Sequence, residues 1–176
     1  MRLREVIQVL NQMRNDGVID RYAIGGAVGA TFYLEPVATL DVDVFIELHA
    51  QANSLIIDLS SIYEYLGKKG GVKEREYIVF ADTPIQFLMP QANSLTDEAL
   101  AEAVEMDVEG MTASVFTAEH IAAIALQTGR SKDKTRVAQF IEEDALDLQR
   151  FQQILARHGL VERWQQFERQ FLSDQS

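Results

Sequence analysis

Residues 22–46 read YAIGGAVGATFYLEPVATLDVDVFI, and this stretch decides the fold. The pattern predicts a short strand, a glycine pair, a brief helix and a second strand. Glu35-Pro36 ends the helix, because the residue before a proline is pushed out of helical geometry. A double glycine and a pair of aspartates therefore fall within one strand–loop–helix–strand unit.

The glycine pair is Gly25-Gly26, directly after the first strand. Glycine lets the backbone turn tightly and approach a ligand with no Cβ in the way. The helix that follows would present free N–H groups to an anion such as a phosphate. Taken alone, a double glycine before a helix is more often only a tight turn, so the pair gains meaning from its neighbours.

The aspartate pair lies on the second strand, which we expect over residues 39–47. Side chains alternate along a strand, so Val42 and Val44 face one way while Asp41 and Asp43 face the other. Two carboxylates side by side in an apolar strand repel each other and are costly to desolvate. A divalent cation removes both costs, and oxygen ligands suit Mg²⁺. The alternative is an edge strand whose aspartates simply face water.

Working outward, the apolar spacing predicts elements of both types on either side of this unit. They are helices over 3–13 and 55–66, strands over 77–80, 85–88 and 111–116, and a helix that starts near Thr96. From Thr117 the spacing is helical almost to the end, with breaks at 129–131, near 144 and at 159. The order predicts an α/β (α+β) fold: a mixed sheet flanked by helices over 1–116, with a helical subdomain over 117–176 packed on it.

Composition restricts the function. The 176 residues include no cysteine, which excludes disulfides and thiolate metal sites. Their net charge is −11. No apolar run approaches the roughly 18 residues of a membrane span, so we expect a soluble cytoplasmic protein. So acidic a chain argues against non-specific binding to nucleic acid, which depends on Lys and Arg. Composition leaves a homo-oligomer open.

The combination of Gly25-Gly26 with Asp41-x-Asp43 resembles the nucleotidyltransferase superfamily, which has the polymerase-beta-like fold. More narrowly, the chain looks like the small AbiEii/DUF6036-like proteins of that superfamily. Three tracts carry the likeness: 22–46, the segment 119–133 with Gly129-Arg130-x-Lys132-Asp133, and the ending from 157 to 164. The similarity spans most of the chain.

The resemblance implies transfer of a nucleotide from an NTP to an acceptor that the sequence does not identify. Gly25 and Gly26 would hold the triphosphate, and Asp41 and Asp43 would bind Mg²⁺ or Mn²⁺. Nucleotide contacts are also expected from Thr39, Arg130 and Lys132. Each has a plainer alternative: Thr39 as the β-branched start of a strand, and the two basic residues as a solvated turn between helices. Lys134 is a weaker candidate of the same kind.

The chain departs from the family pattern at a third position. A further carboxylate on a neighbouring strand usually helps bind metal and activate the acceptor, and here that position is Gln86. An amide cannot take up a proton at neutral pH. Glu47, Glu76 and Asp82 are candidate substitutes. The alternative function is therefore a catalytically weak or inactive relative, a nucleotide-sensing or protein-binding module of a toxin–antitoxin or defence-like pair.

Overall fold

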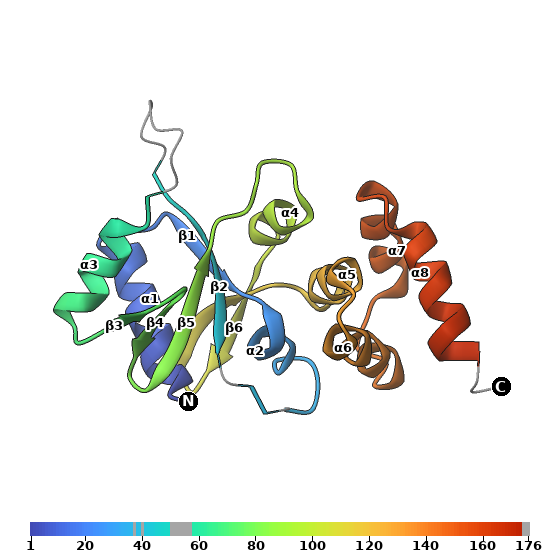
Figure 1. Ribbon diagram of the computed structural model, residues 1–176, viewed down its shortest axis with the longest axis horizontal. Coiled ribbons are helices and arrows are strands. Elements are labelled where there is room, and N and C mark those ends of the chain that lie inside the picture. Colours follow the sequence, from blue (N-terminus) through green and yellow to red (C-terminus); the bar gives the residue numbers. More distant parts are fainter. Residues whose placement is uncertain (37, 40, 50–57, 174–176) are drawn as a thin grey trace.

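The computed structural model describes residues 1–36, 38–39, 41–49 and 58–173, and its strands form one seven-stranded sheet (Figure 1). The strand order is β3-β4-β5-β2-β1-β7-β6. In chain order the strands are β1 (Arg21–Ile24), β2 (Val42–Glu47), β3 (Val72–Glu74), β4 (Tyr77–Phe80), β5 (Thr83–Leu88), β6 (Val104–Val108) and β7 (Met111–Val115).

The sheet is mixed, as predicted. At its centre β2 runs antiparallel to β1 and parallel to β5, and β1 is parallel to β7. The outer strands β3, β4 and β6 add antiparallel hairpins at the two edges. The strand that carries the aspartates is therefore central, with paired neighbours on both sides.

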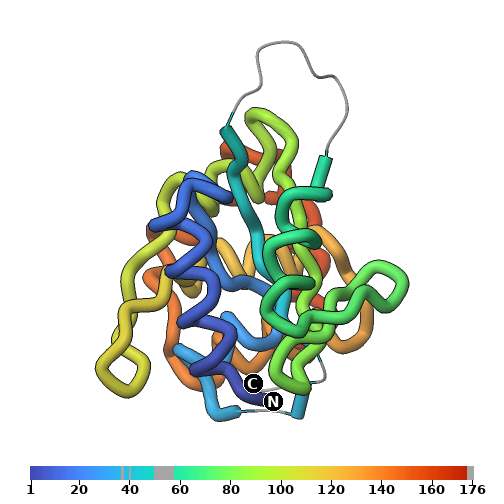
Figure 2. Tube along the Cα trace, turned by 90° about the vertical axis from the view of Figure 1, so that its left-hand side faces the viewer, coloured from blue at the N-terminus to red at the C-terminus, as the bar shows by residue number. Residues whose placement is uncertain are grey.

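Helices cover both faces of the sheet. They are α1 (Leu3–Asn15), α2 (Gly26–Ala30), α3 (Ser60–Lys68), α4 (Leu95–Ala101), α5 (Ala118–Thr128), α6 (Ser131–Glu142), α7 (Leu148–Arg157) and α8 (Val161–Phe167), which a π-helical segment, Glu168–Leu172, continues. Figure 2 shows α1 and α3 in front of the sheet. On the other face lie α2, α4 and α5, and α6 to α8 stack beyond α5 (Figure 1).

Each face of the sheet has its own hydrophobic core. The alternation along β2 sends Val42, Val44 and Ile46 into the core beneath α1 and α3, where all three are fully buried. Phe45 faces the opposite way and packs against Phe116, with ring centroids 4.6 Å apart and the rings tilted by 36°. The face that carries the aspartates is therefore the face on which the C-terminal helices α5 to α8, here called the helical tail, pack.

The central helix of the tail is α5. Its sequence is apolar almost all round and is buried accordingly. Thr117 caps its start by accepting a hydrogen bond from the His120 N–H. Gly129 ends it in the left-handed conformation, with φ of 70°. The predicted break at 129–131 is therefore confirmed, and it turns the chain into α6.

Most predicted elements are confirmed, with three differences. The sequence analysis missed β3, which has only three residues, and β6, in which charged residues alternate with apolar ones. Thr83 and Pro84 belong to β5 and not to the preceding turn. Of the helix expected over 55–66, residues 55–57 lie outside the described residues, and the described helix α3 begins at Ser60. In the part of the chain that the structure describes, no helix is both long and apolar enough to cross a membrane.

Candidate active site

The loop between β1 and α2 packs tightly on β2. The Gly25 N–H donates a hydrogen bond to the Asp43 carbonyl at 3.0 Å, and Gly26 adopts a left-handed conformation with φ of 58°. A Cβ at Gly26 would lie 2.0 Å from Oδ2 of Asp43. A Cβ at Gly25 would lie 2.8 Å from the Phe45 ring. Both positions therefore require glycine because the loop approaches β2 so closely.

The two aspartates lie where this loop meets the sheet. Asp41 immediately precedes β2 and Asp43 is its second residue, and both are half-buried on the face toward α2 and α5. Burial raises the pKa of the Asp43 carboxyl above its ordinary value, and the Asp41 charge raises it further. Repulsion between the two carboxylates is thus a physical feature of the folded chain.

Gln86 lies beside this pair. In the parallel pairing of β2 with β5, Asp43 is in register with Gln86, and Gln86 is also half-buried. The neighbour of Asp43 on the next strand is therefore an amide. That this is the position of the family's third carboxylate stays a prediction.

The three candidate substitutes for that carboxylate lie in different places. Glu47 is at the far end of β2 and pairs with Arg21 at 2.6 Å. Asp82 lies in the turn between β4 and β5, exposed, with Arg2 3.7 Å away. Glu76 is exposed in the turn before β4 and contributes to the electrostatics of Tyr77. Of the three, only Glu76 acts on the same group as the aspartates, because Glu76, Asp41 and Asp43 all raise the pKa of Tyr77.

Tyr77, the first residue of β4, is a neighbour of the pair that sequence analysis did not single out. The negative charge of Asp41 is the main cause that raises the pKa of the Tyr77 hydroxyl. A tyrosine at a strand end reads as ordinary sheet sequence. Only the pairing of β3, β4 and β5 brings it to the aspartates.

Basic residues of the α5–α6 region act electrostatically on the pair. Arg136, Lys132 and Arg130, in decreasing order of effect, all oppose the rise in the pKa of Asp43. Both aspartates in turn help to raise the pKa of Arg130, although its hydrogen bond to Asp133 is the main cause. The fold thus brings a cationic helix end toward the acidic pair, across about 90 residues of sequence.

Two of these placements differ from simple expectation. Arg136, which was not among the candidates, has a stronger effect on Asp43 than Lys132 or Arg130. Lys134 points elsewhere: its ammonium lies 5.7 Å from the ring centroid of Phe171. The sequence signal that could have identified Arg136 is its spacing from Asp133, because positions three apart on a helix share a face.

Further contacts fix α6 in this position. Its Gln139 side chain donates to the Glu35 carbonyl at 3.5 Å, and the Glu35 N–H donates to Glu143 at 3.2 Å. Both bonds anchor α6 to the segment that leads into β2. Thr39 lies in that segment, half-buried, and its hydroxyl donates to the Asp41 carbonyl at 3.3 Å. In the ligand-free chain Thr39 therefore shapes the approach to the pair.

The donor set fits a divalent cation. Asp41 and Asp43 offer carboxylate oxygens on one face, and Gly26 has no Cβ to obstruct the Asp43 oxygen. A cation would offset both causes that raise the pKa of Asp43, its burial first and the charge of Asp41 second. The residues that could hold Mg²⁺ are therefore Asp41 and Asp43.

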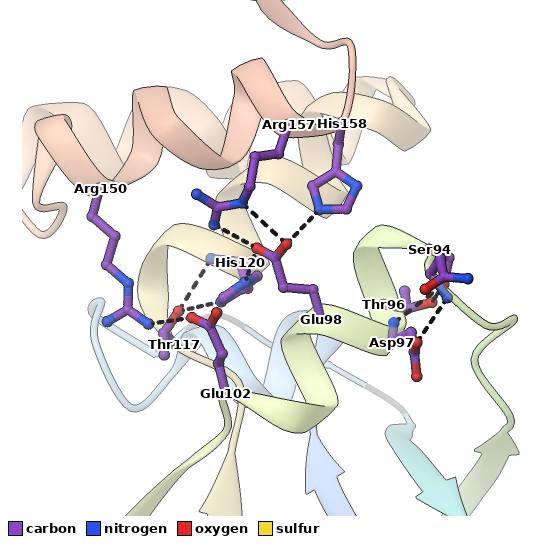
Figure 3. A network of polar contacts seen from close by, with 11 residues as sticks. Ser94, Thr96, Asp97, Glu98, Glu102, Thr117, His120, Arg150, Arg157 and His158 are labelled. Atoms are coloured by element: carbon purple, nitrogen blue, oxygen red, sulfur yellow. Dashed lines mark hydrogen bonds and ion pairs between the residues drawn. The ribbon is translucent and has the colours of Figure 1, made fainter.

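A second acidic cluster lies elsewhere. Possible ligand atoms of Glu98, Glu102 and His120 are within 4.8 Å of one another. Figure 3 shows, however, that Glu98 is already bonded to Arg157, His158 and His120. A cation would have to displace the arginine. We interpret this cluster as an ion-pair network between α4, α5 and α7; in Figure 1, α4 and α7 lie toward the top, whereas α2 and α6 lie toward the bottom.

Comparison with known proteins identifies the fold. No protein-family model and no curated protein matches the chain. An antigenic nucleotidyltransferase-like protein from Paracoccidioides brasiliensis matches with a TM-score of 0.63 and 19% identity, over 92% of this chain and 91% of that one. ANT(2″)-Ia in complex with adenylyl-2″-tobramycin matches with a TM-score of 0.59 and 13% identity, over 93% and 99%.

A solution structure of ANT(2″)-Ia, described as an antibiotic-resistance factor, also matches, with a TM-score of 0.54 and 15% identity, over 96% of this chain and 97% of that one. The likeness covers the sheet and the helical tail together. The chain therefore has the nucleotidyltransferase fold that the sequence predicts. The narrower likeness to AbiEii/DUF6036-like proteins stays a prediction.

Proposed function

We propose that this protein, built on a nucleotidyltransferase fold, transfers a nucleotide from an NTP to an acceptor with the help of Mg²⁺ or Mn²⁺. One observation carries the proposal: the half-buried pair Asp41 and Asp43 lies within electrostatic reach of three cationic side chains of the α5–α6 region, which act on the pKa of Asp43. A metal-bound triphosphate needs both kinds of group at one place, carboxylates for the cation and Lys or Arg for the phosphates.

In this proposal the residues divide the work by charge. Asp41 and Asp43 hold the metal ion, which would neutralise phosphate charge and orient the α-phosphate. Arg130, Lys132 and Arg136 bind triphosphate oxygens. Gly25 and Gly26 let the backbone come close to the nucleotide, and Thr39 keeps the segment before Asp41 in place. Because α2 has only five residues, we assign less of the phosphate binding to its dipole than the sequence suggested.

The reaction is an exchange at the α-phosphorus. An acceptor O–H or N–H gives up its proton, and its oxygen or nitrogen forms the new bond to the α-phosphorus. The bond from that phosphorus to the pyrophosphate oxygen breaks, and pyrophosphate leaves. Gln86 cannot take the acceptor proton, so the proton passes to water, to the phosphates or to Glu76.

The charge of the chain bears on the acceptor. A net charge of −11 repels RNA and other polyanions, and favours a neutral or cationic small molecule. One fold neighbour was crystallised with the adenylylated small molecule adenylyl-2″-tobramycin. We therefore propose a small hydroxyl- or amine-bearing acceptor, used by a cytoplasmic protein.

Thermal melting tests the proposal. Wild type, Asp41→Asn and the control Asp144→Asn are melted with and without Mg²⁺ and each of the four NTPs. A ligand at about 100 times its Kd adds about 2.7 kcal/mol. Each kcal/mol raises the midpoint by roughly 2–4 °C in a domain of this size. We expect a metal-dependent NTP shift in wild type and in the exposed Asp144 control, but none in Asp41→Asn. No shift with any NTP in wild type contradicts the proposal.

The alternative is a nucleotide-sensing or protein-binding module, and Gln86 in register with Asp43 favours it. Pyrophosphate release separates the two functions once binding is established. A sensor binds NTP with Mg²⁺ but releases no pyrophosphate with any acceptor. Release that Asp41→Asn abolishes rules the sensor out.

A further inference from the structure

Asp133, in the first turn of α6, is a charged residue inside the protein. It is 1% exposed, and its carboxylate contacts two arginines. Arg130 donates through Nε to Oδ2 at 2.6 Å and through Nη2 to Oδ1 at 3.4 Å. Arg136 donates through Nη1 to Oδ1 at 3.3 Å. The carboxylate therefore bridges the arginines three positions before and three positions after it.

Burying a carboxylate is costly, and an ion pair rarely repays the whole cost in stability. Replacing a whole buried ion-paired group by hydrophobic residues of similar volume is often neutral or stabilising. The arrangement therefore calls for an explanation beyond stability. What the carboxylate does achieve is to fix the orientation of two long side chains that would otherwise sample many rotamers.

The two arginines differ in exposure in a way that suits a ligand. The Arg136 side chain is 13% exposed and the Arg130 side chain 61% exposed. A guanidinium has five N–H donors, and in the described part of the chain Asp133 takes up two from Arg130 and one from Arg136. Both retain donors for another anion, and both act electrostatically on Asp43.

We propose that Asp133 is a positioning residue, which holds Arg130 and Arg136 in the orientation that grips the triphosphate of the substrate. This inference rests on the proposed function. Arginines fixed before the ligand arrives lose less side-chain entropy on binding. The charge of Asp133 does not repel the ligand, because two guanidiniums already surround it. Without Asp133, the same arginines would be free to turn onto Asp41 and Asp43.

The test measures binding of inorganic triphosphate and of NTP, each with Mg²⁺, to Asp133→Asn. The control Asp144→Asn makes the same change in charge eleven positions later in the chain, beyond the other end of α6. We expect Asp133→Asn to bind both probes about tenfold or more weakly, which corresponds to 1.4 kcal/mol or more. Asp144→Asn should bind within about twofold of wild type, as an exposed change outside the site.

A double-mutant cycle separates positioning from a merely structural role. When both arginines are replaced by alanine, adding Asp133→Asn should weaken binding no further, because Asp133 acts through them. An equal loss in that background overturns the inference. So does unchanged binding by Asp133→Asn in a protein whose wild type binds. If wild type binds neither probe, the proposed function fails first and this inference with it.

Should Asp133→Asn not fold, as judged by circular dichroism, Arg130→Lys takes its place. Lysine keeps the charge but cannot present the planar fork that contacts both Asp133 and a phosphate. We expect weaker triphosphate binding with little change in the ligand-free midpoint. Binding equal to wild type would mean that charge alone suffices, and the inference would be overturned.

Discussion

At the scale of single residues, the geometry of the candidate site depends on the absence of a Cβ at Gly26. Gly26 leaves room for the Asp43 carboxylate, whose Oδ2 lies 2.0 Å from where a Cβ would be. The left-handed backbone at Gly26 adds a second reason for glycine. The close approach to Asp43 therefore requires glycine at position 26 independently of any phosphate binding.

Gly26→Ala should therefore damage stability and function together. The backbone conformation alone costs a residue with a Cβ about 1–2 kcal/mol, and the methyl group must displace the Asp43 carboxylate. We expect a lower melting midpoint and loss of the metal-dependent NTP shift. Gly67→Ala is the matched control: nothing lies within 4 Å of a Cβ at Gly67 in α3. The free energy of unfolding of Gly67→Ala should increase by about 0.5–1 kcal/mol, because glycine inside a helix is less stable than alanine. A normal NTP shift in Gly26→Ala would disprove the close-approach argument.

Gln86→Glu should place a third carboxylate beside Asp43, with which position 86 is in register. We expect tighter Mg²⁺ binding and faster pyrophosphate release, since a general base contributes about 10²–10⁴-fold. The ligand-free protein should become less stable, because a third carboxylate joins two that already repel. Gln91→Glu makes the same change at an exposed position after β5. If Gln86→Glu leaves both metal binding and turnover unchanged, position 86 does not belong to the metal site.

Individual residues also show what sequence can and cannot predict. The face shared by Asp41 and Asp43 follows from strand alternation, which is local and needs no tertiary information. Tyr77 meets Asp41 only through the pairing of neighbouring strands. Arg136 faces Asp43 only because α5 and α6 fold back over the sheet. Helix spacing indicates that Arg136 and Asp133 are neighbours, but nothing local indicates what they face.

At the scale of elements, Glu98 links α4 to the C-terminal helices by hydrogen bonds. It lies in α4, and its carboxylate accepts hydrogen bonds from Arg157 in α7 at 2.8 Å and from His158 at 2.8 Å (Figure 3). It also contacts Nε2 of the fully buried His120 in α5 at 3.1 Å. Because a carboxylate only accepts, this Nε2 carries the proton, and Nδ1 accepts from the Thr117 hydroxyl.

This network should make stability depend on acid in two steps. Arg157 is the main cause that lowers the pKa of Glu98 to about 2, so its contribution is full above the unfolded value of about 4.5 and is lost as the pH falls toward 2. Burial lowers the pKa of His120 below 6.5, so acid also opposes folding there, starting near pH 6.5. We expect the melting midpoint to fall first below about pH 6.5 and again below about pH 4.5.

Two variants assign these steps. Glu98→Gln should cost about 1–3 kcal/mol at pH 7, as loss of a hydrogen-bonded charge, and should remove the lower step. His120→Gln should remove the upper one. Glu64→Gln, an exposed partner of Lys68, is the control and should change little. A Glu98→Gln protein with the midpoint and acid profile of wild type would show that the network does not fasten α4 to α7.

The elements that sequence analysis missed have a common cause. A strand as short as β3 has too few residues to show a period, and it exists because β4 pairs with it. In β6, Glu105 and Asp107 point to water from an edge strand. Such a pattern is compatible with a loop until β7 supplies the partner. Long periodic helices such as α1 and α6 needed no such help.

At the scale of the whole molecule, the predicted boundary at residue 116 separates the strands from the C-terminal helices, but it does not separate two hydrophobic cores. One hydrophobic cluster contains Ala30 and Leu34 near α2, Leu100 of α4 and Phe116, together with α5 to α8. The buried rings of Phe151 and Trp164, 5.1 Å apart, belong to that same cluster. The helices α5 to α8 and their connections thus supply most of the core on that face of the sheet.

A core shared in this way should make the chain unfold as one unit. We expect a single calorimetric transition in which the van't Hoff and calorimetric enthalpies agree. A fragment of residues 1–116 should not fold, because it would expose the apolar surface that α5 covers. The site needs the tail for a second reason, since Arg130, Lys132 and Arg136 all belong to it. If NTP with Mg²⁺ stabilises the protein, it should therefore raise the midpoint of the whole transition. Two resolved transitions, of which the ligand moves only one, would show that the tail folds separately and meets the aspartates only when nucleotide binds.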